Sequence, residues 1–312
     1  MLTQIIMAAL GPIVVGGAVG WLSGKYGFIK RDYSQAFADF VVKIALPIAL
    51  FLAALSSSPS SILNADFALA MAAGLVLAYV VAYVVGKVVY KHNRADATMQ
   101  ALSASFPDMA YCGPPILLAT VGSSGLIAMV IGNLIYTVII LPIALMMIGG
   151  GNKGQSAWKS FGKSLSQPLV FLPILGAVLA IAGVEVPDVI KNSLNELGKT
   201  AGGVALFFLG LFLSGIKMNL RSEIVFNVII KNILQGAVIL GVGLALGLEG
   251  MLLKSAFIIG ILPTATATAT ATPALAVANN VYKDEAASTV LLSTLVSLVT
   301  MTLGIVVVSE WL

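Results

Sequence analysis

Apolar runs of about twenty residues recur along the whole chain, separated by short charged or Gly-, Pro- and Ser-rich stretches. A helix needs about 20 apolar residues to cross a membrane, and it satisfies its own backbone hydrogen bonds there. With 59% hydrophobic residues, 10% charged residues and a mean hydropathy of +1.03, the chain lies outside the range of soluble domains. We therefore predict an all-α membrane protein with ten spans, at 3–24, 33–55, 66–90, 97–121, 124–148, 166–183, 189–215, 223–247, 250–282 and 285–309.

Lys and Arg are distributed unequally over the loops between these spans. Twelve lie in one alternating set of loops, and only Lys191 and Lys254 lie in the other. Cytoplasmic loops carry the excess of basic residues. The twelve therefore predict the cytoplasmic side of an inner or plasma membrane, with both termini on the outer side. The first run lacks a preceding basic segment and an obvious cleavage site, so it is interpreted as a span and not as a signal peptide.

The polar residues exclude several classes of function. The net charge of +4 comes from one side of the membrane, and no basic patch with interleaved aromatic residues predicts a nucleic-acid partner. Cys112 is the single cysteine and His92 the single histidine, so no Cys/His cluster offers a metal or redox site. No nucleophile with an adjacent base is apparent. Neither an enzyme nor a cofactor is expected.

The two halves of the chain, 1–150 and 160–312, repeat each other at an offset of 156 residues. This single offset aligns the tripeptide Ala-Leu-Phe at 49–51 with that at 205–207, and it also pairs Pro12 with Pro168, Gly20 with Gly176, Lys43 with Lys199, and Pro107 with Pro263. Because each half holds five spans, the halves enter the membrane from opposite sides. The sequence thus predicts a 5+5 inverted repeat, the plan of many secondary transporters.

Corresponding spans of the two halves carry proline-bounded interruptions. Span 4 contains "FPDMAYCGPP" at 106–115, and span 9 contains "PTATATATATP" at 263–273. Broken helices at matching places indicate a substrate site, and the two breaks are expected to meet. Only a few residues next to Pro263 or Pro273 are expected to be unwound, because nine extended residues would span roughly 30 Å, about the whole hydrocarbon thickness. The alternative is that the threonines bond the preceding turn and bend a helix.

Three stretches resemble the auxin efflux carrier superfamily, whose bacterial members include malonate and malate permeases. They are "KYGFIKRDYSQAFADFVVKIALPIALFLAAL", "SASFPDMAYCGPPILLATVG" and "YKDEAASTVLLSTLVSL". The resemblance implies ten spans, a scaffold of spans 1, 2, 6 and 7, a transport domain of spans 3–5 and 8–10, and elevator movement about a crossover of spans 4 and 9. Family members often carry Asn followed by Gly-x-Pro in span 4; here Asp108, Gly113 and Pro115 occupy those places.

Asp108 directly follows Pro107, and a carboxyl group at that depth is costly enough to be functional by default. Three roles are open to it. It takes up a proton, since burial disfavours the charged form; it binds sodium together with hydroxyl and carbonyl oxygens of span 9, including Thr264; or it is a structural anchor bonded to a backbone amide.

Other polar residues of the spans are read in two ways. Lys43 and Lys199 lie ten residues into spans 2 and 7, where each either snorkels or offers positive charge to an anion. Lys231 and Asp39 lie nearer helix ends and are interpreted as interfacial. We interpret three further polar residues as making ordinary polar contacts between helices, namely Asn133, Asn279 and Asn280. The candidate substrate-binding residues are Pro107, Asp108, Met109, Tyr111, Gly113, Pro263, Thr264, Thr266, Thr268, Thr270, Lys43 and Asn133, with Asp108 and Thr264 as candidate ion-coupling residues.

These features favour a secondary carrier for a small organic anion, driven by a proton or sodium gradient. The exposed N-termini of broken helices attract carboxylates, and Lys43 favours a dianion such as malonate or malate. The alternatives are a sodium-coupled bile-acid-type symporter and an uncoupled anion channel or exporter. A homodimer through scaffold helices is expected, with span 2 as the main contact and span 7 as a second candidate. Small residues permit close approach in span 2, namely Ala45, Ala49, Ala53 and Ala54.

Overall fold

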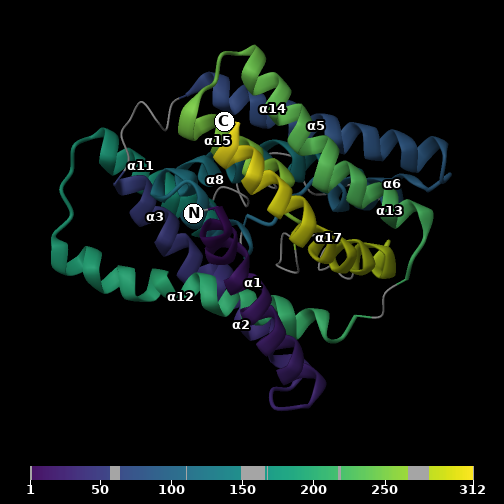
Figure 1. Cartoon of the computed structure of the whole chain (residues 1–312), viewed down its shortest axis with the longest axis horizontal. Coiled ribbons are helices and arrows are strands. Elements are labelled where there is room, and N and C mark those ends of the chain that lie inside the picture. The colour runs from purple at the N-terminus through teal and green to yellow at the C-terminus, as the bar shows by residue number, and fades with distance from the viewer. Residues whose placement is uncertain are drawn as a thin grey trace.

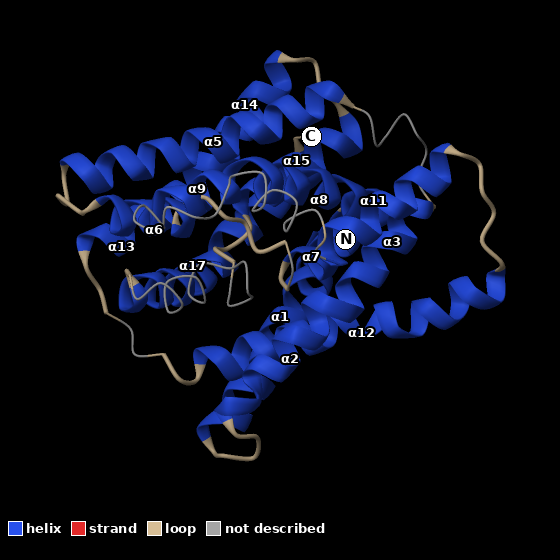
Figure 2. Ribbon diagram, turned by 180° about the vertical axis from the view of Figure 1, so that it is seen from behind, coloured by secondary structure: helices blue, strands red, loops and turns tan. Residues whose placement is uncertain are grey.

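The computed structural model describes residues 2–56, 64–109, 111–148, 166, 168–216, 219–265 and 281–311. Within these residues the chain is helical and has no strand, as Figure 2 shows. The predicted all-α class is therefore confirmed. Six helical runs are long and apolar enough to cross a membrane: Leu2–Lys25, Arg31–Leu55, Ala65–Val88, Asp188–Leu213, Ser222–Ala245 and Lys283–Glu310.

Four of these six runs are single helices, and two are composite. The single helices are α1 (Leu2–Lys25), α5 (Ala65–Val88), α12 (Asp188–Leu213) and α17 (Lys283–Glu310). The run Arg31–Leu55 consists of η1 (Arg31–Tyr33), α2 (Ser34–Phe40), η2 (Val41–Ala45) and α3 (Leu46–Leu55), and the run Ser222–Ala245 consists of α13 (Ser222–Ile229), η4 (Ile230–Leu234) and α14 (Gln235–Ala245).

The other predicted spans correspond to shorter helices in the described residues. They are α6 (Arg94–Ser103), α7 (Gly113–Thr120), α8 (Ser123–Ile135), η3 (Tyr136–Ile140), α9 (Leu141–Ile148), α11 (Pro168–Ile181) and α15 (Gly250–Ile261). The predicted span at 97–121 is divided between α6 and α7, with Pro107 in the interval. Helix α15 likewise ends two residues before Pro263. Proline lacks an N–H and disfavours a helical residue before it, so both interruptions follow from the sequence.

The helices form two groups, which Figure 1 shows on opposite sides of the molecule. In one group α1 packs on α12, and α3 packs on α11 and α12. In the other α5 packs on α6 and α14, α14 on α15, and α13 on α17. Helices α7 and α8 join them, because α7 contacts α1 and α15 while α8 contacts α3 and α15.

Glycines allow the backbones of the first group to touch. A Cβ atom on Gly20 of α1 would lie 2.0 Å from the carbonyl oxygen of Phe207 in α12. A Cβ atom on Gly176 of α11 would lie 2.4 Å from the carbonyl oxygen of Phe51 in α3. Small residues at helix interfaces let backbones approach in this way. Neither position accepts a larger residue unless the helices separate.

Three segments of π-helix, η2, η3 and η4, lie inside otherwise α-helical runs of the described chain. Each is five residues long, and π-turns inside α-helices are frequent at functional sites. Lys43 lies in η2, Tyr136 in η3 and Lys231 in η4. Two of the three segments thus carry a lysine inside a membrane-spanning run.

Candidate functional site

The two proline breaks lie against each other and form an antiparallel bridge between Pro107 and Thr264. The N–H of Asp108 donates to the carbonyl of Pro263 (2.8 Å), and the N–H of Ala265 donates to the carbonyl of Phe106 (2.9 Å). Broken backbone within a membrane must find partners in the protein. Each break supplies the partners that the other lacks. We call this pairing, with the loop that leads to α7, the crossover.

Asp108 is 1% exposed and shapes the loop after the bridge. Its Oδ1 accepts a hydrogen bond from the N–H of Tyr111 (3.0 Å), and its carbonyl accepts one from the N–H of Gly113 (2.9 Å), where α7 begins. The Cys112 thiol also interacts with its carboxyl group. A carboxylate that accepts the N–H of a nearby residue is a common turn device. These bonds are the ones expected of an aspartate that anchors the backbone by accepting an amide N–H, which is one of the three roles open to Asp108.

Thr264 is fully buried, and both its side chain and its N–H have partners. Its hydroxyl donates to the carbonyl of Ser103 in α6 (2.8 Å), and its N–H donates to Oγ of Ser293 in α17 (2.9 Å). Ser293 in turn donates to Oδ1 of Asn232 (2.6 Å), whose amide donates back to the carbonyl of Ser293 (3.0 Å). The second break is thus tied to α6, α17 and η4.

Two long side chains of the run Ser222–Ala245 bind the ends of the two broken helices. Gln235 donates from Nε2 to the carbonyl of Ser105, just beyond the end of α6 (2.7 Å). Lys231, one turn earlier, donates from Nζ to the carbonyl of Gly260 in the last turn of α15 (3.0 Å). Both side chains are fully buried. The last carbonyls of a helix have no partner within it, so these two residues supply donors at each break.

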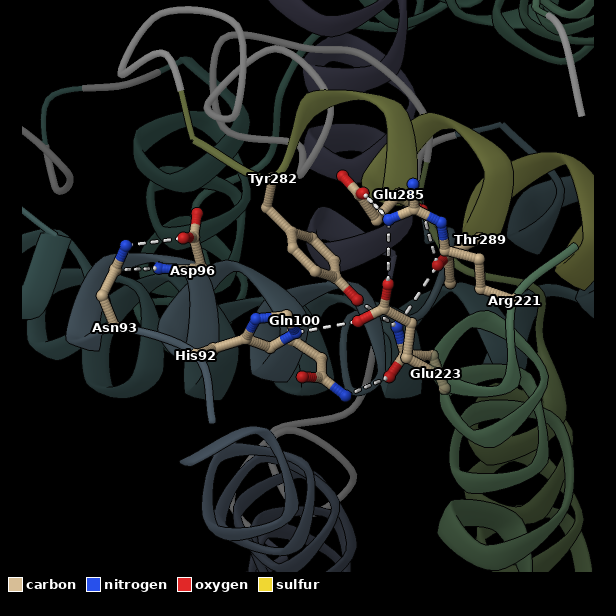
Figure 3. Close-up of polar contacts among 10 residues, drawn as sticks. His92, Asn93, Asp96, Gln100, Arg221, Glu223, Tyr282, Glu285 and Thr289 are labelled. Carbon is tan, nitrogen blue, oxygen red and sulfur yellow. Dashed lines mark hydrogen bonds and ion pairs between the residues drawn. The ribbon is translucent and has the colours of Figure 1, made fainter. Parts of the chain in front are cut away.

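A second polar cluster, shown in Figure 3, joins three connections between helices. His92, between α5 and α6, contacts Glu223 at the start of α13, with Nε2 and Oε2 2.8 Å apart. Arg221 binds Glu285 at the start of α17 (2.8 Å). The Tyr282 ring meets the His92 ring edge-on at a centroid distance of 5.5 Å. We call these five residues the loop clasp.

A buried amide links the loop clasp to the membrane-spanning helices. Asn227 donates from Nδ2 to the hydroxyls of Tyr282 (3.2 Å) and Thr289 (3.3 Å), and its Oδ1 accepts from Gln100 of α6 (3.1 Å). Asn227, Lys231 and Gln235 follow one another at four-residue spacing, so they share one face of their helix. That face runs from the loop clasp to the crossover.

The structure brings most of the described candidate residues together. Pro107, Asp108, Pro263 and Thr264 form the bridge itself. Met109, Tyr111 and Gly113 follow in the same loop, and all three are buried. The Tyr111 ring packs on that of Phe208 in α12 (4.9 Å), while its hydroxyl has no hydrogen-bond partner in the described part of the chain. The crossover therefore touches the first helix group through Tyr111.

The other candidates lie around this centre or outside the described residues. Asn133 is buried in α8, next to Gly132, which lies close to the Met109 sulfur. Lys43 is half exposed and forms an ion pair with Asp39 (2.9 Å). Lys199 pairs with Glu196 (2.9 Å) on an exposed surface. The remaining residues, Thr266, Thr268, Thr270, Asn279 and Asn280, lie outside the described residues.

The model of the "Membrane transport protein" family matches residues 5–305. The chain belongs to this family. This confirms the resemblance to the auxin efflux carrier superfamily. "Uncharacterized transporter YfdV" of Escherichia coli (strain K12) is 29% identical over 274 residues, which cover 85% of this chain and 86% of the relative. "Putative malonate transporter" of Rhizobium meliloti (strain 1021) is 25% identical over 296 residues, 92% of this chain and 86% of the relative.

Sequence reasoning misplaced one residue of this membrane transport protein and missed others. Lys231 is not interfacial, because its side chain is fully buried and binds α15. Proximity to a helix end was the wrong criterion, because Lys231 lies in η4, well inside the run Ser222–Ala245. The four-residue spacing of Asn227, Lys231 and Gln235 was the available signal. The contacts of Ser293 have no comparable signal, because they join segments far apart in the sequence.

Proposed function

We propose that this protein is a secondary active transporter for a small organic anion, a dicarboxylate such as malonate or malate. The observation that carries the proposal is the crossover. In a helical membrane transport protein, two helices are interrupted at proline and pair through their broken backbones. Irregular backbone of this kind, at matching places in two halves, characterises substrate sites of secondary transporters. A relative named "Putative malonate transporter" supports the substrate class.

The proposed architecture has ten spans in a 5+5 inverted repeat, with halves at 1–150 and 160–312. The glycine contacts support it. Gly176 and Phe207 lie 156 residues after Gly20 and Phe51, and the close approach of Gly20 to Phe207 has its counterpart in that of Gly176 to Phe51. A pseudo-two-fold axis that relates the two halves would produce such a pair of contacts.

Elevator movement would carry spans 3–5 and 8–10 as a transport domain past a scaffold of spans 1, 2, 6 and 7. The two helix groups support this division, and α7 with Tyr111 lies where they meet. Spin-label distances between α12 and α5 should then take two values, one with and one without substrate. A single unchanged distance would count against elevator movement.

The proposed substrate contacts are the crossover loop and the residues facing it. The buried Tyr111 hydroxyl would provide a donor for a carboxylate, and the positive end of the α7 dipole would attract it. The first amides of α7 do not contribute, because the N–H of Gly113 donates to the carbonyl of Asp108 and Pro114 and Pro115 have no N–H. Met109, Gly113, Asn133 and the threonines Thr264, Thr266, Thr268 and Thr270 would line the remainder. Asp108 would carry the coupling ion, either a proton or a sodium ion shared with Thr264.

Two other functions have weaker support. A sodium-coupled bile-acid-type symporter would share the ten-span plan, but residues 250–282 contain no glutamate or glutamine. An uncoupled anion channel would need a continuous pore lined by charge or by a filter. In the described residues, the polar side chains at the crossover, Lys231, Gln235 and Thr264, bond to backbone carbonyls, which gives no support to a pore lined by charge.

The test is uptake of labelled malonate and malate by proteoliposomes, with proton and sodium gradients imposed separately. Accumulation above the equilibrium level under at least one gradient is expected. Uptake that only equilibrates under every gradient would indicate a channel. No uptake of any carboxylate, by protein that is folded in the bilayer, would refute the proposed function.

Lys43→Met is expected to reduce uptake of dianions by about tenfold while changing that of monoanions little, since one charged contact is lost. Lys43 lies in the π-helical segment η2 of a membrane-spanning run and is half exposed, paired with Asp39, which is the structural reason to expect a substrate effect. Competition of unlabelled malonate and of unlabelled acetate against labelled substrate measures the effect on dianions and on monoanions separately. Lys199→Met, which removes the exposed lysine at the matching repeat position, is the control. Equal losses for both classes of anion would contradict the proposed contact.

We also propose a homodimer through span 2 in the inner or plasma membrane, with both termini outside. Span 2 presents exposed apolar side chains such as Ile44, which support the contact. Of its small residues, Ala45 and Ala54 are buried within the protomer and Ala49 packs beside Gly198 of α12, so they serve packing inside the chain. Light scattering of the protein in nanodiscs should give the mass of two chains. A fully active monomer would contradict the dimer, and a terminal tag that is protected from added protease in intact spheroplasts would contradict the orientation.

A further inference from the structure

The connection between α1 and η1 combines basic and aromatic residues in a short turn. We call residues 25–33 the basic turn. The flanking helical runs, Leu2–Lys25 and Arg31–Leu55, are both long and apolar enough to cross a membrane, and only residues 26–30 separate them. A connection that short keeps the turn at the membrane surface. Figure 1 shows it projecting at the end of α1 and α2, away from the second helix group.

The basic turn has a fixed shape. Gly27 adopts a φ of +75°, and the N–H of Ile29 returns to the carbonyl of Ser23 (3.3 Å), which is a common way to end a helix. Gly24 in the last turn of α1 is buried, and a Cβ atom there would collide with the Ser214 side chain beyond α12. The turn is therefore held against the first helix group and presents one set of side chains outward.

The aromatic side chains of the turn are exposed. Phe28 is 82% exposed, Tyr26 is 68% exposed and Tyr33 is 56% exposed. An exposed phenylalanine ring gains nothing from the contacts of its own chain. Aromatic side chains are enriched where a membrane meets water, because the headgroup region covers their rings and still solvates their polar groups. At the membrane surface, lipid would cover all three rings.

The three cations of the turn, Lys25, Lys30 and Arg31, have no carboxylate partner in the described residues, which include every Asp and Glu of the chain. The Lys25 ammonium group lies over the Trp21 ring, 4.3 Å from its centroid. Other exposed lysines do have carboxylate partners, in the pairs Lys43–Asp39, Lys191–Asp188 and Lys199–Glu196. The turn thus offers a group of cationic donors, which suit a phosphate group.

We propose that the basic turn binds the headgroups of anionic phospholipids and anchors the first helix group at the membrane surface. The aromatic rings enter the headgroup region, while Lys25, Lys30 and Arg31 bind lipid phosphates. Basic segments beside a membrane span attract anionic lipids in this way. The proposal depends neither on the transported substrate nor on the side of the membrane that the turn faces. A soluble protein partner is less suited to the site, because both ends of the turn continue directly into membrane spans.

Lipid selectivity provides the first test. In nanodiscs that contain phosphatidylglycerol, the wild-type protein should melt roughly 5 °C higher than in phosphatidylcholine alone, since three cations contribute. The variant with Lys25→Gln, Lys30→Gln and Arg31→Gln should lose most of this gain, and about 1 M NaCl should remove it from the wild type. The control variant, Lys191→Gln with Lys199→Gln, removes two paired lysines and should keep the gain. No gain in the wild type, a gain that resists salt, or an unchanged gain in the triple variant would overturn the proposal.

The depth of Phe28 in the membrane provides the second test. A fluorophore attached to Phe28→Cys should be quenched by brominated lipids and shielded from iodide in the water. Cys112 is buried and does not compete for the label. Val80→Cys, at an exposed position of α5, is the reference inside the membrane. Quenching of the Phe28→Cys label by iodide alone would place the turn in water, overturn the lipid assignment and favour a soluble protein partner.

Discussion

Asp108→Asn is expected to abolish gradient-driven accumulation of the anion and to leave substrate exchange largely intact. Asn can still accept the N–H of Tyr111 through its amide oxygen, so the turn into α7 is preserved. It can neither take up a proton nor carry a charge. A transporter that binds its substrate but has lost its coupling group can still exchange one substrate molecule for another. Proteoliposomes measured with and without a gradient, and with internal unlabelled substrate, separate the two activities.

The Asp108→Asn experiment needs a check on folding, because Asp108 is buried and its Oδ1 accepts the N–H of Tyr111 in the turn before α7. The melting temperature of the purified variant provides that check. Asp66→Asn, in the exposed first turn of α5, is the matched control. Normal accumulation by folded Asp108→Asn would exclude a coupling role and leave the carboxylate as a turn-forming group.

Gly20→Val and Gly176→Val should each cause a large loss of folded protein. The new Cβ atoms would lie 2.0 Å and 2.4 Å from backbone carbonyl oxygens on the facing helix. No side chain rotation relieves such a contact, so the helices must separate. Overpacking commonly costs about 1–3 kcal/mol, and we expect values at or above the upper end, because backbone atoms are involved. Melting temperature and the monodisperse fraction after gel filtration report the effect.

Two glycines of the same helix group serve as controls for these substitutions, Gly17 on α1 with Gly20 and Gly202 on α12, which packs on α1 and α3. A Cβ atom on Gly17 of α1 or on Gly202 of α12 would meet no atom within 4 Å. Gly17→Val and Gly202→Val should therefore remain near the wild-type melting temperature, apart from the small difference in helix propensity. If all four variants melted alike, the close contact of backbones would not be what holds these helices together.

Much of the fold could be predicted from the sequence, because membrane insertion is governed by local properties. A helix in a membrane satisfies its own backbone, so an apolar run of sufficient length is enough to predict it. The six long runs fall where hydropathy places them. Pro107 likewise lies in the break between α6 and α7, and Pro263 follows the end of α15. A proline ends a helix because of its own ring and missing N–H, so no contact with another segment is needed to predict these breaks.

The partners of buried polar groups were not predictable in the same way. In span 8 the four-residue spacing of Asn227, Lys231 and Gln235 marks a polar face, but this spacing does not identify the groups that the face contacts. Lys231 and Lys43 both lie in π-helical segments of long runs, yet Lys231 is buried and Lys43 is half exposed. Which lysine meets a backbone carbonyl of another helix depends on the helix packed against it.

The sequence by itself determined that this protein lies in a membrane, and it determined its helices, its two proline breaks and its family. Each of these depends on residues close together in the chain or on a pattern over its whole length. Only the tertiary structure decided that Asp108 bonds to Pro263, that Thr264 bonds to Ser103 and Ser293, and that Lys231 caps α15. These bonds join residues from 29 to 161 positions apart. A buried donor takes whichever acceptor packing brings within reach, and packing is a property of the whole chain.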